Sequence, residues 1–248
     1  MPEIIANTTD GNQNSGIVSA GTGWSTAHDA VGFLNPATTQ TSTSAFGPRV
    51  EFSTNRGGIY YIVRNFFDFD LSSITDTITE ATFSAMTSVN GGHDAIVVKS
   101  GHDPSTTTDD WFSTWLTGQS ITLSGWDTGD VTAYSSNHTV AGNGSFTDYT
   151  LNSDAITQLN SIAGTSTKFK IALLNYDHDY LNVDPNNAGG SSNLQRTGIV
   201  YANHGTSASR PHLNLTTGTA AYGNNVNGVS IERVNGIAAA DIEKISGI

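Results

Sequence analysis

The chain has 248 residues, no cysteine, and a formal net charge of −12 from 10 basic and 22 acidic side chains. This acidic excess disfavours nucleic-acid binding, the absence of cysteine excludes disulfide and thiolate chemistry, and no apolar run approaches the roughly 18 residues of a membrane span. Thr, Ser, Asn and Gly together make up 108 residues, whereas lysine occurs only four times. This composition favours short strands joined by turns over long surface helices, and so an all-β sandwich or barrel.

The middle of the chain is dense in patterns typical of β-strands. Before them lie two short apolar runs, Ile4–Ala6 and Ile17–Val18, separated by a turn signal at Asp10-Gly11-Asn12. Gly58–Phe69 carries apolar residues on both alternating faces, which predicts a central strand buried inside a sandwich. Ala81–Met86 alternates apolar and polar residues, as a half-exposed strand does. The other expected strands are Ala95–Lys99, Ile121–Leu123, Val131–Tyr134, Phe146–Leu151, Lys168–Leu174, Tyr180–Val183, Gly198–Tyr201 and His212–Leu215.

Two short helices are expected to interrupt the strands and to cover an end of the sandwich. In the segment 107–116, Trp111 and Trp115 lie one helical turn apart and share a face. In the second helix, Ser153 is the expected N-cap and Gly164 the expected end. The apolar face of this second helix is formed by Ile156, Leu159 and Ile162.

The C-terminal residues differ in character from the rest of the chain. After a small-residue linker, a unit of apolar, Asn or Ser, Gly and apolar residues begins at Val226, at Val234 and at Ile245. Asn-Gly between apolar residues favours a tight turn with positive φ. A segment this short cannot build a hydrophobic core alone, so we expect residues 218–248 to be a docking or oligomerisation tail, with a plain extension as the alternative. The apolar residues expected to make the contact are Val226, Val229, Val234, Ile237, Ile242 and Ile245.

One stretch of the sequence resembles a known family. Arg64–Ile74, followed by Ile78–Phe83, resembles the R-x-x-x-x-F-D-L-S-S-I … I-x-x-A-T-L core of the DNRLRE-type jelly-roll domains. Ser209–Leu215 resembles the final R-P-x-L-x-V strand of that family. The resemblance spans roughly residues 1–217 and implies a jelly-roll β-sandwich there. The family's S-R-E stretch is replaced by Tyr180–Asp184, so no ligand site is carried over from it.

Two further stretches, Ser124–Val131 and Asn175–Val183, are similar to structural proteins of marine tailed phages. The Asn-Gly tail also resembles C-terminal modules seen on such proteins, and together these resemblances imply a virion protein. The surface composition is typical of a protein that works outside cells, yet the opening residues carry no secretion signal. A protein assembled in a cytoplasm and released on a particle satisfies both observations, as does a mature secreted domain with an added Met.

The expected fold is therefore an all-β jelly-roll β-sandwich over residues 1–217, with two short helices and a small C-terminal docking module over 218–248. Tryptophan beside acidic or amide side chains suits glycan recognition, because a flat apolar ring then adjoins hydrogen-bond acceptors. The candidate ligand-binding residues are Trp24, His28, Trp126 and Asp127. The alternative for these tryptophans is a place in or near the core, with the indole N–H satisfied locally.

A cluster of oxygen ligands suits calcium. Asp177, Asp179 and Asp184 lie within a short Asp- and Asn-rich segment, and Ca²⁺ takes 6–8 oxygen ligands. A structural calcium site there competes with ordinary turn chemistry, in which Asp and Asn bond to their own backbone. No other cofactor is expected. Asp68 and Asp70 share a strand face at a spacing compatible with a glycosidase pair, but exposed or backbone-bonded strand-end carboxylates are the favoured interpretation.

No nucleophile elbow, phosphate loop or dinucleotide motif occurs, and we expect a protein that is not an enzyme. The leading hypothesis is a phage virion surface protein, as a fibre, tail appendage or capsid decoration that gives adhesion or particle stabilisation. Its partners would be other virion proteins, copies of itself and a host surface glycan, without nucleic acid or membrane insertion. The alternative hypothesis is a secreted bacterial carbohydrate-binding module of a polysaccharide-active system. A cement protein without a ligand is the third.

Overall fold

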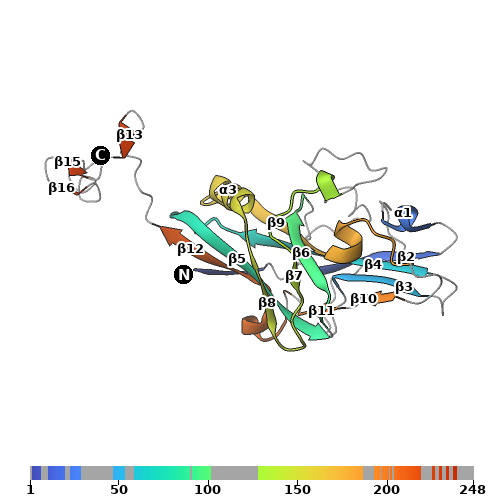
Figure 1. Cartoon of the computed structure of the whole chain (residues 1–248). Helices are drawn as coiled ribbons and strands as arrows, with labels where there is room; N and C mark the ends of the chain where they lie inside the picture. The colour runs from blue at the N-terminus through green and yellow to red at the C-terminus, as the bar shows by residue number, and fades with distance from the viewer. Residues whose placement is uncertain are drawn as a thin grey trace.

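The computed structural model describes residues 2–6, 11–19, 23–28, 47–53, 59–89, 91–101, 128–186, 193–195, 197–200, 202, 204–218, 225–226, 229–230, 233–234 and 237–238. Within these ranges the chain forms two large antiparallel sheets (Figure 1) and two two-stranded ones near the C-terminus. The five-stranded sheet contains β1 (Glu3–Ile5), β12 (His212–Gly218), β5 (Thr77–Val89), β11 (Gly198–Ile199) and β8 (Phe146–Thr150). The seven-stranded sheet contains β10 (Asn193–Gln195), β3 (Arg49–Ser53), β4 (Ile59–Asp70), β9 (Lys168–Asn175), β6 (Asp94–Lys99), β7 (His138–Thr139) and β2 (Gly11–Ser19).

The two sheets pack face to face around one large core. Phe67 and Phe69 of β4 meet Phe83 of β5, with ring centroids 5.3 and 6.0 Å apart. All three rings are buried, and Ala81 and Ala85 lie on the same face of β5 as Phe83 because side chains alternate along a strand. The core also takes Ile171, Leu173, Leu213 and Leu215 from β9 and β12. This arrangement confirms the mostly-β, two-sheet class expected from the composition.

The outer face of β4 is buried as well. Tyr60 and Ile62 pack with Trp24 and Ala27 of the helix α1 (Gly23–His28), and Phe66 belongs to a second small cluster. The expectation of a central strand with two apolar faces at Gly58–Phe69 is therefore confirmed. The seven-stranded sheet has a covering layer on its outer side, whereas Glu80 on the outer face of β5 is exposed.

The helix α3 (Ser153–Ile162) closes one end of the sandwich, with Ala155, Leu159 and Ile162 in the core. Its N-cap is Asn152, whose side chain accepts hydrogen bonds from the N–H groups of Asp154 and Ala155. The prediction that Ser153 is the cap is thus wrong by one residue. Asn offers the same acceptor one position earlier. The expected helix at 107–116 lies outside the described residues.

Two of the expected strands are wrong. Val131–Tyr134 follows the 3₁₀ turn η3 (Thr128–Asp130) and makes only an isolated bridge, between Ala133 and Val98. In the segment Tyr180–Val183, Tyr180 is the last residue of the single π-turn η4 (Tyr176–Tyr180), and the residues after it form a turn. The Asn175 side chain accepts a hydrogen bond from the His178 N–H, which turns the backbone away from the extended course of β9.

Several strands begin or end at other residues than the sequence predicts. The turn signal at 10–12 falls partly inside β2, which begins at Gly11. β11 is limited to Gly198–Ile199, and a short 3₁₀ turn, η5 (Ser207–Ser209), precedes β12. The expected strands at 81–86, 95–99, 146–151, 168–174 and 212–215 correspond to β5, β6, β8, β9 and β12. No helix in the described ranges is both long enough and apolar enough to cross a membrane.

The tail forms two separate β-hairpins of minimal size. β13 (Asn225–Val226) pairs with β14 (Val229–Ser230), and β15 (Arg233–Val234) pairs with β16 (Ile237–Ala238). The register places Val226 opposite Val229 and Val234 opposite Ile237, so each connection is two residues long and is an Asn-Gly pair. Ile242 and Ile245 lie outside the described residues.

Candidate functional site

A buried ion pair lies between the seven-stranded sheet and the segment that follows β9. Arg64 projects from the outer face of β4 and donates from Nε to Asp179 Oδ2 at 2.8 Å and from NH2 to Asp179 Oδ1 at 2.6 Å. The two side chains are 1% and 0% exposed. Such a two-point contact matches the planar guanidinium to the carboxylate, and it fixes η4 on the sheet.

Trp24 and His28 of α1 complete this cluster. Arg64 also donates to the His28 carbonyl oxygen at 3.1 Å, and His28 Nε2 lies 2.9 Å from the Asp179 carbonyl oxygen. Trp24 donates from its indole nitrogen to Asn182 Oδ1 at 2.9 Å, and its ring lies 5.3 Å from the imidazole of His28. Trp24 is 8% exposed and His28 is 1% exposed. The two rings thus lie in the protein interior, with polar atoms bonded to the chain itself.

The three candidate calcium ligands have different partners. Asp179 pairs with Arg64, whereas Asp177 accepts from Gln195 Nε2 at 3.0 Å. Asp184 accepts from the Tyr60 hydroxyl, at 3.0 Å to Oδ1 and 3.2 Å to Oδ2. Burial and the neighbouring Asp184 carboxylate raise the pKa of Tyr60 to about 12. Across the described ranges, no group of three His, Asp or Glu side chains is arranged to hold a metal ion.

Of the other ligand candidates, Trp126 and Asp127 lie outside the described residues. Asp68 is fully buried and accepts from Lys168 Nζ, at 3.1 Å to Oδ1 and 2.9 Å to Oδ2. Asp70 is exposed and accepts from the Ser72 N–H, and the hydrogen bonds from Ser72 lower the pKa of the Asp70 carboxyl. The expectation of an exposed or backbone-bonded carboxylate is therefore confirmed for Asp70 and wrong for Asp68, which is buried and paired with Lys168.

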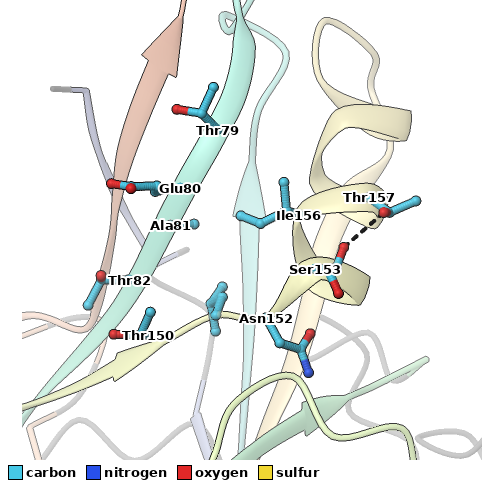
Figure 2. Close-up of a pocket in the computed structure, with 10 residues that line it drawn as sticks. Thr79, Glu80, Ala81, Thr82, Thr150, Asn152, Ser153, Ile156 and Thr157 are labelled. Atoms are coloured by element: carbon cyan, nitrogen blue, oxygen red, sulfur yellow. Dashed lines mark hydrogen bonds between the residues drawn. The ribbon is translucent and has the colours of Figure 1, made fainter.

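A second site is open to solvent, in a groove of about 650 Å³ between β5 and α3. Figure 2 shows residues 79–82 along β5 on one side, Ser153, Ile156 and Thr157 of α3 on the other, and Thr150 and Asn152 between them. α3 is held beside β5 by Asn160, which accepts from the Ile78 N–H and donates to the Ile78 carbonyl, both at 2.8 Å. The groove therefore has rigid walls, one a strand and the other a helix.

Some polar groups of this groove are already engaged. The Thr79 hydroxyl donates to the Thr216 carbonyl, the Thr157 hydroxyl donates to the Ser153 carbonyl, and Asn152 caps α3. The side chains of Glu80, Thr82, Thr150 and Ser153 have no hydrogen-bond partner in the described part of the chain. Thr82 lies directly opposite Thr150 in the pairing of β5 with β8. These four groups can exchange hydrogen bonds with water or with a ligand.

No sequence motif indicates either the buried ion pair of Arg64 and Asp179 or the groove between β5 and α3. Arg64 entered only as part of the family resemblance, although an arginine within a strand that is apolar on both faces signals a buried acidic partner. The residues of the groove belong to Thr- and Ser-rich segments that are typical of any solvent-facing strand. Such a pattern does not indicate a binding site. The sequence did bring Trp24, His28, Asp179 and Asp184 into consideration, and the structure gathers these four around Arg64 and Tyr60.

Comparison with known proteins adds no family assignment. None of the family models matches the chain, and no relative was found among curated proteins.

Proposed function

We propose that this chain is a non-enzymatic phage virion surface protein, a fibre, tail appendage or capsid decoration that gives adhesion or particle stabilisation. In this proposal the sandwich is a jelly roll, displayed on the particle, and residues 218–248 bind to the particle or to further copies. The two minimal hairpins within residues 225–238 are the observation that carries the proposal. Strands of two residues cannot hold a hairpin by themselves in water, so the tail gains stability from a surface it docks against.

Two features of the sandwich support the jelly-roll part of the proposal. β1 pairs with β12, so the first and last strands of the sandwich lie side by side in one sheet (Figure 1). β5 and β6 are consecutive but belong to different sheets, so the chain crosses between the sheets there instead of forming a hairpin. Both features are common in Greek-key sandwiches.

The outer face of the five-stranded sheet supports the adhesive part. Glu3, Asn214, Thr82 and Thr150 follow one another across four strands in register. On the same face the half-buried rings of Phe146 and His212 meet edge to face, with centroids 5.2 Å apart. A broad polar face with a limited apolar part is suited to contact with a glycan or protein surface without causing aggregation.

The test is mass spectrometry of purified virus particles made with the full chain and with a variant that lacks residues 219–248. We expect the full chain to be incorporated and the truncated chain to be lost from the particles while still folding. The matched control, Asp76→Asn with its tail intact, is expected to be incorporated like the wild type. Absence of the full chain from the particles, or full incorporation of the truncated chain, would contradict the proposal.

The groove favours a second candidate, the secreted bacterial carbohydrate-binding module. Its open walls and unengaged hydroxyl groups suit a ligand rich in hydroxyl groups. Glycan binding by a chain that is secreted and is never found on particles would support this alternative over the first proposal. Neighbouring genes for capsid, portal or tail proteins would favour the virion protein.

A further inference from the structure

The groove between β5 and α3 has the features of a small-ligand site. Its volume of about 650 Å³ lies in the range of natural ligand pockets. Its two walls are fixed to each other by the hydrogen bonds between Asn160 and Ile78. Ile156 of α3 is only partly buried and lines the groove, which gives it an apolar patch beside the polar groups.

The chemistry of the lining restricts the ligand. None of the ten lining residues is Lys, Arg or His, and the only charged one is Glu80. A carboxylate only accepts hydrogen bonds, so it favours a ligand that presents hydroxyl donors. The hydroxyls of Thr82, Thr150 and Ser153 can both donate and accept, which matches a partner whose groups also do both. An anionic ligand would meet Glu80 and a chain of net charge −12.

We propose that this groove binds a neutral glycan chain. Glu80 accepts hydrogen bonds from sugar hydroxyls, the opposed pair Thr82 and Thr150 exchanges hydrogen bonds with the next sugar unit, and Ile156 contacts the apolar C–H face of a ring. This inference deepens the adhesive role proposed above and rests on it.

The affinity of one groove is expected to be low. The lining contains no aromatic ring, so binding depends on hydrogen bonds that replace those with water, each of small net value. A dissociation constant of about 1 mM is expected for a single site. Many copies on one particle would turn this weak contact into firm attachment, because later contacts form at high effective concentration.

The test is titration of the full chain with neutral hexasaccharides of glucose, mannose and xylose, followed by NMR chemical shifts. At least one neutral hexasaccharide is expected to bind, with a dissociation constant that is unchanged between 50 mM and 500 mM salt. The double variant Thr82→Val and Thr150→Val keeps the shape and strand preference of both side chains but removes both hydroxyls, and it is expected to weaken binding about tenfold. Glu80→Gln is expected to weaken it several-fold.

Two controls separate a lost contact from a lost fold. Thr77→Val lies on the same strand outside the groove, and Asp76→Asn changes the exposed residue just before that strand. Both are expected to bind as the wild type does, and all variants are expected to keep the wild-type melting temperature within about 2 °C. A groove variant that melts much lower is replaced by Ser153→Ala, which lies at the exposed start of α3.

The proposal would be overturned by no binding of any neutral hexasaccharide, by binding of uronic-acid or amino-sugar hexamers only, or by unchanged binding in the double variant. Each of these results leaves the particle test untouched, because incorporation into particles is measured on the tail and without a glycan. Conversely, a chain that binds the hexasaccharide but is absent from particles would support the groove as a glycan site and would contradict the virion role.

Discussion

Arg64 and Asp179 are 115 positions apart in sequence, yet they form a two-point ion pair with both side chains almost fully buried. We expect Asp179→Asn to lower the free energy of unfolding by about 3–5 kcal/mol, because it leaves a buried guanidinium without its counter-charge. Replacing both residues, Arg64→Met with Asp179→Leu, is expected to cost less than the single change. Urea unfolding measures both. The exposed Asp76→Asn is the control, expected within about 0.5 kcal/mol of the wild type. If Asp179→Asn lowers the free energy of unfolding by no more than about 0.5 kcal/mol, the stabilising role of the ion pair is contradicted.

His93 gives a pH dependence with a defined sign. Burial lowers its pKa, against the opposing effects of the Pro48 carbonyl and of Asp177 and Asp94. The unfolded chain therefore binds this proton more readily, so stability is fully present above about pH 6.5 and falls as the pH drops below it.

The measurement for His93 is the midpoint of urea unfolding at pH 7.5 and at pH 5.0. The wild type is expected to lose stability between these values. His93→Gln keeps a donor for the Pro48 carbonyl, which lies 3.2 Å from His93 Nε2, and is expected to lose less. His204→Gln, on a surface turn, is the matched control and is expected to follow the wild type. Equal losses in the wild type and in His93→Gln would refute the assignment.

Asn160 joins α3 to the sheet. Asn160→Leu is expected to lower the free energy of unfolding by about 1–2 kcal/mol, because both backbone groups of the buried Ile78 lose their partner. The same variant is expected to weaken glycan binding, since one wall of the groove is no longer fixed. Thermal unfolding and the hexasaccharide titration check the two effects. Ser161→Ala, on the next position of the helix, is the control. Unchanged stability in Asn160→Leu would show that α3 is held by its apolar face alone.

The candidate calcium ligands give a prediction for the effect of removing metal ions on stability. A Ca²⁺ ion shared by Asp177, Asp179 and Asp184 would have to compete with Gln195, Arg64 and Tyr60 for their oxygens. Because the guanidinium is already bound at two points, we expect EDTA to change the melting temperature by less than about 2 °C, and added calcium chloride to restore nothing. A large drop that calcium reverses would instead establish the structural calcium site.

The core was the most predictable part of the structure. The alternation of Phe67 and Phe69 with Phe66 and Asp68 indicated a strand buried on both sides, and β4 is that strand. The segment at Tyr180–Val183 has the same kind of alternation and was mistaken for a strand. There the Asn175 side chain accepts a hydrogen bond from the His178 N–H, and the ion pair with Arg64 holds Asp179. The ion pair joins residues 115 positions apart, so no local pattern could predict it.

The two candidate sites also differ in how far the sequence could predict them. Trp24 was predicted as a glycan contact because a flat apolar ring adjoins acceptors there, and Asp184 as a calcium ligand because its segment is rich in oxygen ligands. In the structure these two side chains instead hold α1 and the segment after η4 on the sheet. The groove is made from Thr, Ser and Glu, residue types that occur throughout this sequence. Only the pairing of β5 with β8 and the position of α3 bring them together.

The pairing of β1 with β12 also has a mechanical meaning. Glu3 lies opposite Asn214 and Ile5 opposite His212, so the two ends of the sandwich meet at one end of the same ladder. A pulling force applied between residues 2 and 218 therefore peels these strands apart one hydrogen bond at a time. A force between the tail and a ligand bound to β5 instead shears β12 along β5. Seven residues of β12 are paired with β5, so their hydrogen bonds must break together. Single-molecule pulling is expected to show a lower rupture force in the first geometry. In the proposed virion protein, attachment through a bound glycan would therefore place the force along the stronger direction.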